Sequence, residues 1–269
     1  MPINKNIINA HLETDFIGSK IYLFDKLTST NDKAHELAKA GATEGTVVIA
    51  ESQTSGKGRR GRGWFSPPGR NIYTSIILRP SISPEAAPRL TLVAAVALCE
   101  AIMESLKAFG VHSAGIKWPN DILIDKKKCA GILTEMKINS DGLDFVIIGI
   151  GINVNMDLCD IPEELKNYAT SLSIEAGDIL SREGILQSLY SKIENWYKRY
   201  LSEGFLPIKE RWEVLSAIKG AFVRAASSTG SLHSYEEGQA LGLDDEGELL
   251  IRKDDGTVIA VRTGDIVIL

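Results

Sequence analysis

Four short strand-like segments lie close together in the middle of this chain, and their spacing restricts the fold more than any other feature. The segments are rich in apolar residues and occupy residues 115–118, 121–124, 130–136 and 145–152. Turn residues separate them, and they follow one another too closely for a helix in each connection. We therefore predict an α+β fold with a mainly antiparallel or mixed sheet, rather than a strict alternation of strands and helices.

Helices and further strands should flank this group. Strands are expected at residues 46–50 and 72–78, and helices at residues 33–40, 83–109, 181–200 and 208–215. The helix that starts near Ser83 has a proline at its first position, and its middle, residues 90–102, is apolar almost all round. We expect that helix to be deeply buried.

The last part of the chain has a different character. After Gly220, five short strand-like runs are joined by turns such as residues 244–247 and 254–256. Closely spaced short strands with tight turns are typical of a small β-barrel. We therefore expect two domains, residues 1–218 and residues 219–269.

Composition places the chain among ordinary globular proteins. Its 269 residues are 44% hydrophobic and 24% charged, which allows a sizeable core. No run reaches the ~18 consecutive apolar residues of a membrane span, and residues 1–20 lack the pattern of a secretory signal. Cys99, Cys129 and Cys159 form no C-x-x-C pair, so we expect reduced, structural thiols in a cytoplasmic protein.

Positive charge is concentrated in one stretch of an otherwise acidic chain. The net charge is −5, yet the residues between Glu51 and Glu85 include six lysines or arginines and no acid. An acidic chain of this kind is a poor general coat for nucleic acid. The stretch therefore indicates a discrete basic feature.

Within that stretch, residues 56–64 have the sequence G-K-G-R-R-G-R-G-W. The glycines let the backbone approach a ligand closely, and the guanidinium groups offer planar forks for carboxylate or phosphate. The spacing resembles a phosphate-binding P-loop, but Arg62-Gly63 stands where Lys-Ser/Thr is required. Two interpretations stay open at this point: a loop that wraps a small polyanion, and an arginine-glycine patch that binds nucleic acid.

Two further motifs bear on that choice. K-W-P-N-D at residues 117–121 lies between two strand-like segments, and Pro119 favours an extended conformation before it, so Lys117 projects from a stiff segment. G-I-G-I-N-V-N at residues 149–155 fails as a dinucleotide fingerprint because Val154 occupies the third glycine position. Small residues with an asparagine can still form a pocket wall.

No nucleophile–base set is evident in the sequence. It contains neither G-x-S-x-G nor H-E-x-x-H, and its four histidines are scattered. A site with many cations and no evident nucleophile indicates chemistry driven by binding and charge neutralisation. Nucleotidyl or acyl transfer fits that description better than hydrolysis.

In combination, these motifs resemble those of the biotin–protein ligase family (biotin–[acetyl-CoA-carboxylase] ligases). The resemblance rests on S-T-N at residues 29–31, Gln53 with residues 56–64, and K-W-P-N-D leading to A-G-I-L at residues 130–133. It implies a catalytic domain followed by an SH3-like barrel. It also implies two half-reactions: biotin and Mg-ATP give biotinyl-5′-AMP and pyrophosphate, and the biotinyl group then passes to a lysine of a biotin carboxyl carrier protein.

The same resemblance implies roles for individual residues. The expected biotin-site residues are Ser29, Thr30, Asn31, Gln53, Lys57, Gly58, Arg59 and Lys117, and the expected ATP-site residues are Arg59, Arg62, Trp64, Lys117 and Asn153. Lys117 and Arg59 are the expected catalytic residues, with Lys117 between the biotin carboxyl group and the α-phosphate. Asn120 and Asp121 are expected to help hold Mg²⁺. Such positive charge offsets the repulsion between a carboxylate and a triphosphate.

Two features depart from the family's pattern. Lys57 stands where many members have arginine, which puts a bidentate contact from that position in doubt. Residues 1–20, which precede the first expected strand, are too few for the DNA-binding domain of regulatory members. We therefore expect a ligase with biotin, ATP and a carrier protein as partners, without DNA or a membrane, and with a homodimer left open.

Other interpretations stay in view. A lipoate–protein ligase shares the fold, although its members do not normally carry the arginine-rich loop. A nucleic-acid-binding module would show steeply salt-dependent binding. For a ligase, we expect residues 56–64 to be mobile when empty and to order over the biotinyl adenylate.

Overall fold

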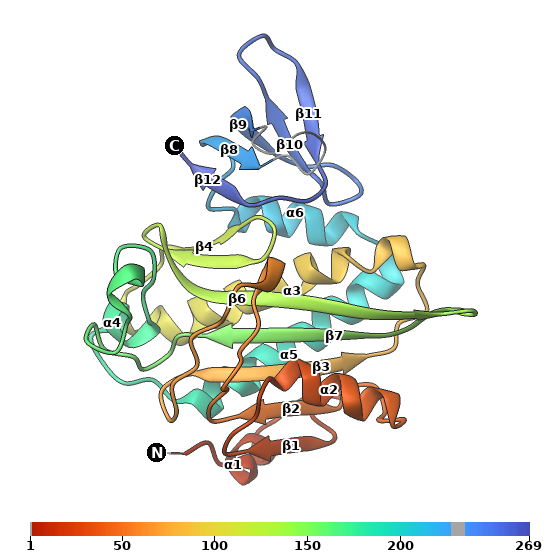
Figure 1. The fold of residues 1–269 in the computed structure, drawn as a ribbon, viewed down its shortest axis with the longest axis vertical. Coiled ribbons are helices and arrows are strands. Elements are labelled where there is room, and N and C mark those ends of the chain that lie inside the picture. The colour runs from red at the N-terminus through yellow and green to blue at the C-terminus, as the bar shows by residue number, and fades with distance from the viewer. Residues whose placement is uncertain (1, 227–234) are drawn as a thin grey trace.

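A seven-stranded sheet forms the centre of the molecule, whose computed structural model describes residues 2–226 and 235–269. The strands are β1 Ile21–Phe24, β2 Val47–Ala50, β3 Ile72–Leu78, β4 Ala114–Lys117, β5 Asp121–Ile124, β6 Lys127–Asn139 and β7 Gly142–Ile152. Their order is β1-β2-β3-β7-β6-β5-β4 (Figure 1). β1 and β2 run parallel, and the other neighbours in this sheet run antiparallel. The predicted mixed, mainly antiparallel sheet is therefore confirmed.

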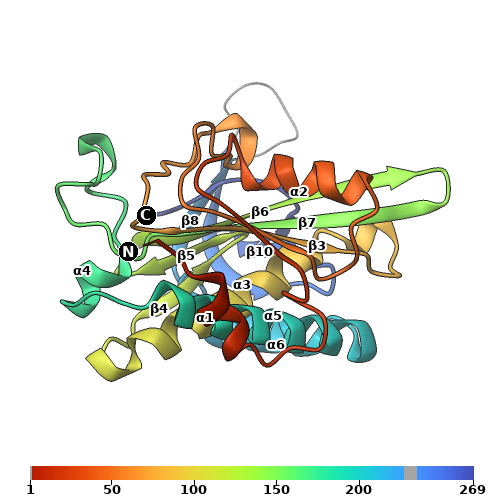
Figure 2. The same cartoon turned by 90° about the horizontal axis from the view of Figure 1, so that it is seen from below.

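Helices cover both faces of this sheet. They are α1 Lys5–Ala10, α2 Thr30–Lys39, α3 Arg89–Leu106, α4 Leu172–Ala176, α5 Arg182–Glu203 and α6 Leu206–Leu215. Figure 2 shows α2 on one face and α1, α3, α5 and α6 on the other. A small apolar cluster that includes Ala34, Val48 and Phe145 packs under α2, and the main core lies on the opposite face. Amphipathic α2 thus sits over the sheet face that also carries the site described below.

The long helix expected over residues 83–109 consists of three segments. Short 3-10 turns at Pro84–Ala86 and Lys107–Phe109 flank α3, and Pro88 precedes α3, where its missing N–H costs no hydrogen bond. Within the described residues, Pro84–Phe109 is the one helical stretch long and apolar enough to cross a membrane. Its most apolar window is 67% buried inside the fold, as predicted for a core helix.

The hairpin of β6 and β7 is longer than expected. β6 begins at Lys127 rather than Ala130, and the pairing with β7 continues to Asn139. On its other edge, β6 pairs with β5 only as far as Gly131. The hairpin therefore extends past its neighbours (Figure 1). The short helices α1 and α4 were not predicted, because one or two turns carry little periodicity.

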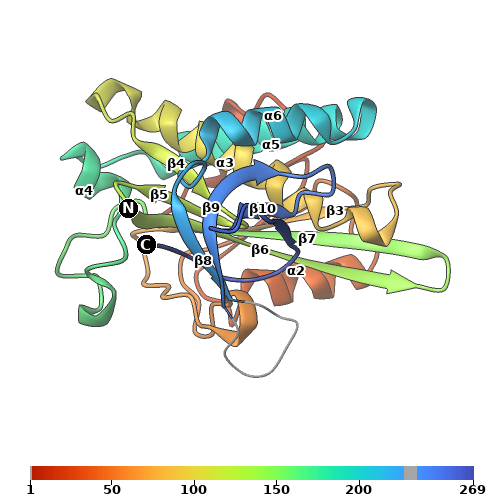
Figure 3. The same cartoon turned by 90° about the horizontal axis from the view of Figure 1, so that it is seen from above.

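A second sheet follows, as predicted for the C-terminal part. Its strands are β8 Phe222–Ala226, β9 Tyr235–Leu243, β10 Leu249–Arg252, β11 Val258–Val261 and β12 Ile266–Ile268, in the antiparallel order β11-β10-β9-β8-β12. It packs beside α6 and the β4–β5 end of the first sheet (Figures 1 and 3). The indole N–H of Trp118 joins the two parts by donating to the Gly247 carbonyl at 3.0 Å. The domain boundary near Ile218 stays a prediction.

Candidate active site

A cavity of about 230 Å³ lies among the start of α2, residues 53–65, and strands β6 and β7. Four cationic side chains line it, those of Lys57, Arg59, Arg62 and Lys128, and the described lining residues include no Asp or Glu. Much of the remaining wall is apolar or glycine. A concave site with this charge is suited to an anionic ligand that also carries an apolar part.

Buried polar side chains form the end of the cavity beside α2. Ser29, Thr30 and Asn31 are each less than 5% exposed. The Gln53 Oε1 accepts a hydrogen bond from the Thr30 backbone N–H at 2.8 Å, and the Ser75 hydroxyl lies 2.6 Å from Asn31 Oδ1. Because these groups hold one another, they present a fixed set of donors and acceptors to a ligand.

The glycine- and arginine-rich segment forms a small hairpin over the cavity. The Gly58 N–H donates to the Arg62 carbonyl at 2.7 Å, and the Trp64 N–H donates to the Gly56 carbonyl at 2.8 Å. Arg60, at the tip, has a left-handed φ of 55°. The expected mobility of this segment in the empty protein stays a prediction.

Acidic residues outside the cavity hold the cations of this hairpin. Asp265, just before β12, lies 3.6, 3.7 and 3.0 Å from guanidinium nitrogens of Arg59, Arg60 and Arg62. Lys57 pairs with Asp32, and this hydrogen bond raises the pKa of Lys57. Burial lowers the pKa of Arg59, but a guanidinium keeps its charge. The C-terminal part therefore contributes directly to the position of the arginines.

The glycines at the end of β7 create space for side chains of the site. A Cβ on Gly149 would fall 2.0 Å from Asn31 Oδ1, and one on Gly151 would fall 2.5 Å from Trp64 Cε2. Both glycines and Asn153 line the cavity. The G-I-G-I-N motif therefore forms a pocket wall, as its small residues suggested.

Lys117 and Asp121 are the two predicted site residues that the structure does not bring to the cavity wall. They face each other across the register of β4 and β5. Burial lowers the pKa of Lys117, and the nearby cations Lys128 and Arg62 act in the same direction. Lys117 therefore lies outside the described lining of the cavity, but close enough to Lys128 and Arg62 for their charges to act on it.

Lys128 is the lysine that lines the cavity instead, and none of the sequence motifs predicted it. Its Nζ lies 2.6 Å from Asp121 Oδ1 and 5.1 Å from the centre of the Trp64 ring. No local signal separates Lys128 from its lysine neighbours in residues 126–128. A bulge in the pairing of β5 with β6, between Ile122 and Leu123, sets the register there.

The segment of residues 156–169 forms an apolar wall that was also not predicted. Its cavity-lining members are Met156, Ile161, Pro162, Leu165, Tyr168 and Ala169. We call the whole segment of residues 156–169 the covering loop. It follows directly from the G-I-G-I-N-V-N motif, and its last part lies beside Lys128, whose N–H donates to the Tyr168 carbonyl and whose Nζ is 5.1 Å from the Trp64 ring.

Asn120 and Asp121 both contact cations of the site, and their expected role in holding Mg²⁺ stays a prediction. Asn120 Oδ1 accepts from Arg59 at 3.0 Å, and Asn120 Nδ2 donates to the Ile132 carbonyl at 2.7 Å. Asp121 is paired with Lys128. No group of three or more His, Cys, Asp or Glu residues suited to a metal ion is present in the described parts of the chain. The two side chains therefore lie next to the cationic cluster, where a metal bound with a triphosphate would also lie.

Comparison with known proteins supports this picture. Residues 23–153 match the Biotin/lipoate A/B protein ligase family, and residues 227–269 match the Biotin protein ligase C terminal domain. The chain is 45% identical over 254 residues to the bifunctional ligase/repressor BirA of Bacillus subtilis, a match that covers 94% of this chain and 76% of that protein. It is 35% identical over 233 residues to the biotin--[acetyl-CoA-carboxylase] ligase of Paracoccus denitrificans, covering 85% of this chain and 92% of that one.

Solved structures agree with these relatives. The biotin protein ligase from Aquifex aeolicus in complex with biotin and ATP has a TM-score of 0.78 and 27% identity, over 93% of this chain and all of that chain. The fold and the cationic cavity therefore define a member of the biotin and lipoate protein ligase class. Within that class, the C-terminal domain and the relatives show that the chain belongs to the biotin protein ligase family, as its motifs predicted. The lipoate alternative is not favoured.

Proposed function

We propose that this protein is an ATP-dependent ligase that forms biotinyl-5′-AMP and transfers biotin to a lysine of a biotin carboxyl carrier protein. One observation carries the proposal: a single cavity combines a buried polar end, four cationic side chains, an apolar wall and no acid among its described lining residues. A carboxylate and a triphosphate repel each other, and fixed positive charge stabilises the transition state in which they meet.

The polar end of the cavity is the proposed biotin end. Thr30, Asn31 and Gln53 offer neutral donors and acceptors that match the ureido ring of biotin, and Ser29 lies beside them. Lys57 and Gly58 belong to the hairpin that would cover the ligand. This placement directs the biotin carboxylate toward the cationic part of the site.

Lys128 is the proposed catalytic cation, in the role that was expected for Lys117. Lys128 lines the cavity and its Nζ lies 5.1 Å from the centre of the Trp64 ring, and we propose that it contacts both the biotin carboxylate and the α-phosphate there. A carboxylate oxygen attacks the α-phosphorus, the bond from phosphorus to the bridging oxygen breaks, and pyrophosphate leaves. Arg59 and Arg62 neutralise the charge on the departing phosphates.

The nucleotide would occupy the other end. Trp64 offers an aromatic face to the adenine, and Asn153 lies nearby with the covering loop. We propose that Mg²⁺ arrives with the triphosphate, since Mg²⁺ commonly binds through substrate phosphates and waters. Asn120 and Asp121, which contact Arg59 and Lys128, stay the proposed protein groups that would help to hold it.

The second half-reaction needs only the acceptor. The lysine amine of the carrier attacks the acyl carbon of the mixed anhydride, AMP leaves, and the amine loses a proton as the amide forms. A cytoplasmic location is part of the proposal, because the carrier substrate and ATP are found there.

A homodimer is also proposed. It would form along the part of β6 beyond Gly131 that β5 does not pair, where Met136 and Ile138 are exposed.

A direct test is intact-mass spectrometry of a biotin carboxyl carrier domain after incubation with the protein, ATP and Mg²⁺. We expect one added biotinyl group with biotin, and no added lipoyl group with lipoate. Transfer of lipoate in preference to biotin would contradict the proposed substrate, and binding of nucleic acid without any transfer would favour the binding-module alternative. Sedimentation velocity on the same sample tests the dimer.

A further inference from the structure

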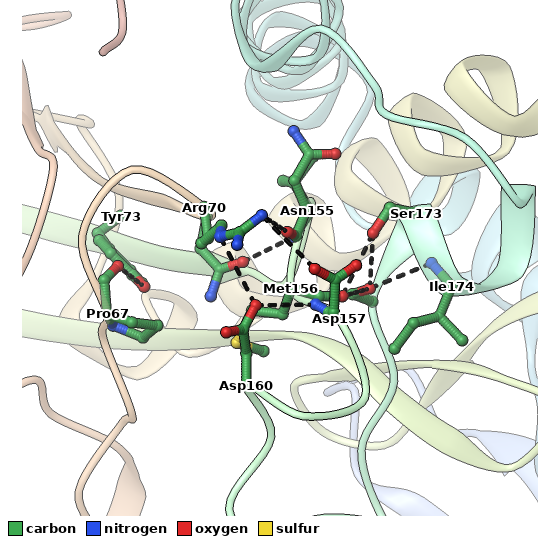
Figure 4. A network of polar contacts seen from close by, with 12 residues as sticks. Pro67, Arg70, Tyr73, Asn155, Met156, Asp157, Asp160, Ser173 and Ile174 are labelled. Atoms are coloured by element: carbon green, nitrogen blue, oxygen red, sulfur yellow. Dashed lines mark hydrogen bonds and ion pairs between the residues drawn. The ribbon is translucent and has the colours of Figure 1, made fainter. Parts of the chain in front are cut away.

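Arg70 lies outside the cavity, yet it makes several contacts with the beginning of the covering loop. Its Nη1 is 3.7 Å from Asp157 Oδ2, and its Nε is 3.6 Å from Asp160 Oδ2. The Arg70 carbonyl accepts from the Asn155 N–H at 3.0 Å, and Nη1 donates to the Asn155 carbonyl at 3.4 Å. Figure 4 shows these groups converging on one side chain.

The first turn of the covering loop is folded around this contact. The Asp157 N–H donates to Asp160 Oδ2 at 3.0 Å, and the Asp160 N–H donates to the Asp157 carbonyl at 3.0 Å. Ser171 anchors the same turn by donating to the Met156 carbonyl at 2.6 Å. The two carboxylates are therefore held together, and Arg70 offsets their mutual repulsion.

The other end of the covering loop is attached to the proposed catalytic lysine. The Lys128 N–H donates to the Tyr168 carbonyl at 2.8 Å, and the Thr170 N–H donates to the Lys128 carbonyl at 3.0 Å. The loop thus spans from Arg70 to Lys128. Its apolar members Met156, Ile161 and Leu165 line the cavity between these two attachments.

We infer that Arg70 is a positioning residue for the nucleotide: through Asp157 and Asp160 it holds the covering loop as an apolar wall opposite Trp64. Arg70 itself is 44% exposed and does not line the cavity, so it acts through the loop and not on the ligand. The inference rests on the proposed placement of the nucleotide at the Trp64 end. It assigns Arg70 to ATP binding and not to biotin binding, because the polar end is formed by other segments.

The test is ATP–pyrophosphate exchange, which reports KM for ATP and KM for biotin separately. Loss of two exposed ion pairs should change the equilibrium constant for ordering the loop roughly five-fold. Arg70→Ala should therefore raise KM for ATP about five-fold and leave KM for biotin unchanged. Arg70→Lys keeps the charge and should restore part of the loss. Arg224→Ala is the matched control, because Arg224 is equally exposed and pairs with Glu237 in the second sheet.

Variants of Asp157 and Asp160, the carboxylate partners of Arg70, provide an independent test. The double variant Asp157→Asn with Asp160→Asn should raise KM for ATP as much as Arg70→Ala does, and adding Arg70→Ala to it should cause no further rise. Chymotrypsin should also cleave the loop faster in Arg70→Ala, at Leu158 and Tyr168, which are 58% and 71% exposed. Neither readout would change if Arg70 were an ordinary surface charge.

Trp64→Ala separates the two ways in which the inference can fail. A raised KM for ATP in Trp64→Ala beside an unchanged value in Arg70→Ala would overturn the role of Arg70 alone. An unchanged KM for ATP in Trp64→Ala would overturn the placement of the nucleotide, and with it the inference. Equal changes in the KM values for ATP and biotin in Arg70→Ala would also overturn it, because they would indicate a general loss of structure.

Discussion

Gly151 and Trp64 are in such close contact that no other residue type fits between the β7 backbone and the indole ring. A Cβ on Gly151 would lie 2.5 Å from Trp64 Cε2, well inside van der Waals contact. The indole therefore packs against the strand at Gly151, with the Lys128 ammonium 5.1 Å from its centre. This contact fixes the aromatic surface that we assign to the adenine.

Gly151→Ala should displace Trp64 and weaken the use of ATP. A shift of about 1 Å in a substrate-positioning group can cost roughly 100-fold in rate, so we expect a loss of that order in kcat/KM for ATP. Gly184→Ala is the control, because a Cβ there meets Ser181 Oγ at an ordinary 3.5 Å within α5. Steady-state exchange kinetics on both variants check the prediction, and similar kcat/KM values for Gly151→Ala and wild type would contradict the assigned role of Trp64.

Asp265→Asn should loosen the arginine hairpin. The carboxylate faces Arg59, Arg60 and Arg62, and exposed ion pairs contribute up to about 1 kcal/mol each. We expect trypsin to cleave after these arginines roughly five-fold faster in the variant, and biotin with ATP to slow the cleavage in both proteins. Glu236→Gln, which removes a partner of Lys253 in the same sheet, serves as the control.

The cleavage rates also test whether the hairpin responds to ligand. Equal rates in wild type and Asp265→Asn would show that the contact does not hold the hairpin. Equal rates with and without biotin plus ATP would contradict the expected ordering over the adenylate.

Glu194 should make the fold sensitive to acid. It accepts hydrogen bonds from the backbone N–H groups of Asp15, Phe16 and Ile17 at 2.6, 3.0 and 2.8 Å, and from Lys198 at 2.7 Å. Burial alone would raise the pKa of Glu194, but the bonds from Lys198 and the backbone lower it overall. A lowered pKa in the folded state stabilises the protein above the unfolded pKa of about 4.3, and this stabilisation is lost as the pH falls through the folded pKa.

Urea unfolding at pH 7 and at pH 4 measures this contribution. Glu194→Gln should lower the free energy of unfolding at pH 7 by about 2 kcal/mol. Below pH 5, the free energy of unfolding of the variant should depend less on pH than that of wild type. Glu203→Gln, on the exposed end of the same helix, should change neither value much. The same pH dependence in wild type and Glu194→Gln would exclude this carboxylate as the titrating group.

Local sequence was sufficient for most of the sheet and for the basic segment of the site. The glycines and arginines of residues 56–64 act within one short segment, so their pattern predicted an anion-binding loop, while the choice between a small polyanion and nucleic acid needed the other motifs. The four closely spaced strands in residues 115–152 predicted antiparallel pairing for the same reason. Asp265, in contrast, lies far along the chain from the arginines it holds, and no sequence pattern links them.

The choice between Lys117 and Lys128 could not be made from the sequence. Both lysines lie on strands that pair with β5, and a bulge beside Lys128 shifts the β5–β6 register in a way that no local pattern predicts. The covering loop was missed because residues 156–169 mix polar and apolar residues without a period of two or 3.6. Its shape comes from its contacts with Arg70, Lys128 and Ser171, and these contacts exist only in the folded protein.

ATP–pyrophosphate exchange with biotin, measured side by side for Lys128→Ala and Lys117→Ala, decides which lysine acts on the reacting groups. Removing a charge that contacts the reacting groups should cost about 100- to 1,000-fold in kcat, and we predict this loss for Lys128→Ala in a protein that remains folded by circular dichroism. Lys117→Ala, which removes a charge outside the described lining of the cavity, should retain most of the exchange rate. A folded Lys128→Ala variant with near-normal exchange, beside an inactive Lys117→Ala, would contradict the account and return the catalytic role to Lys117.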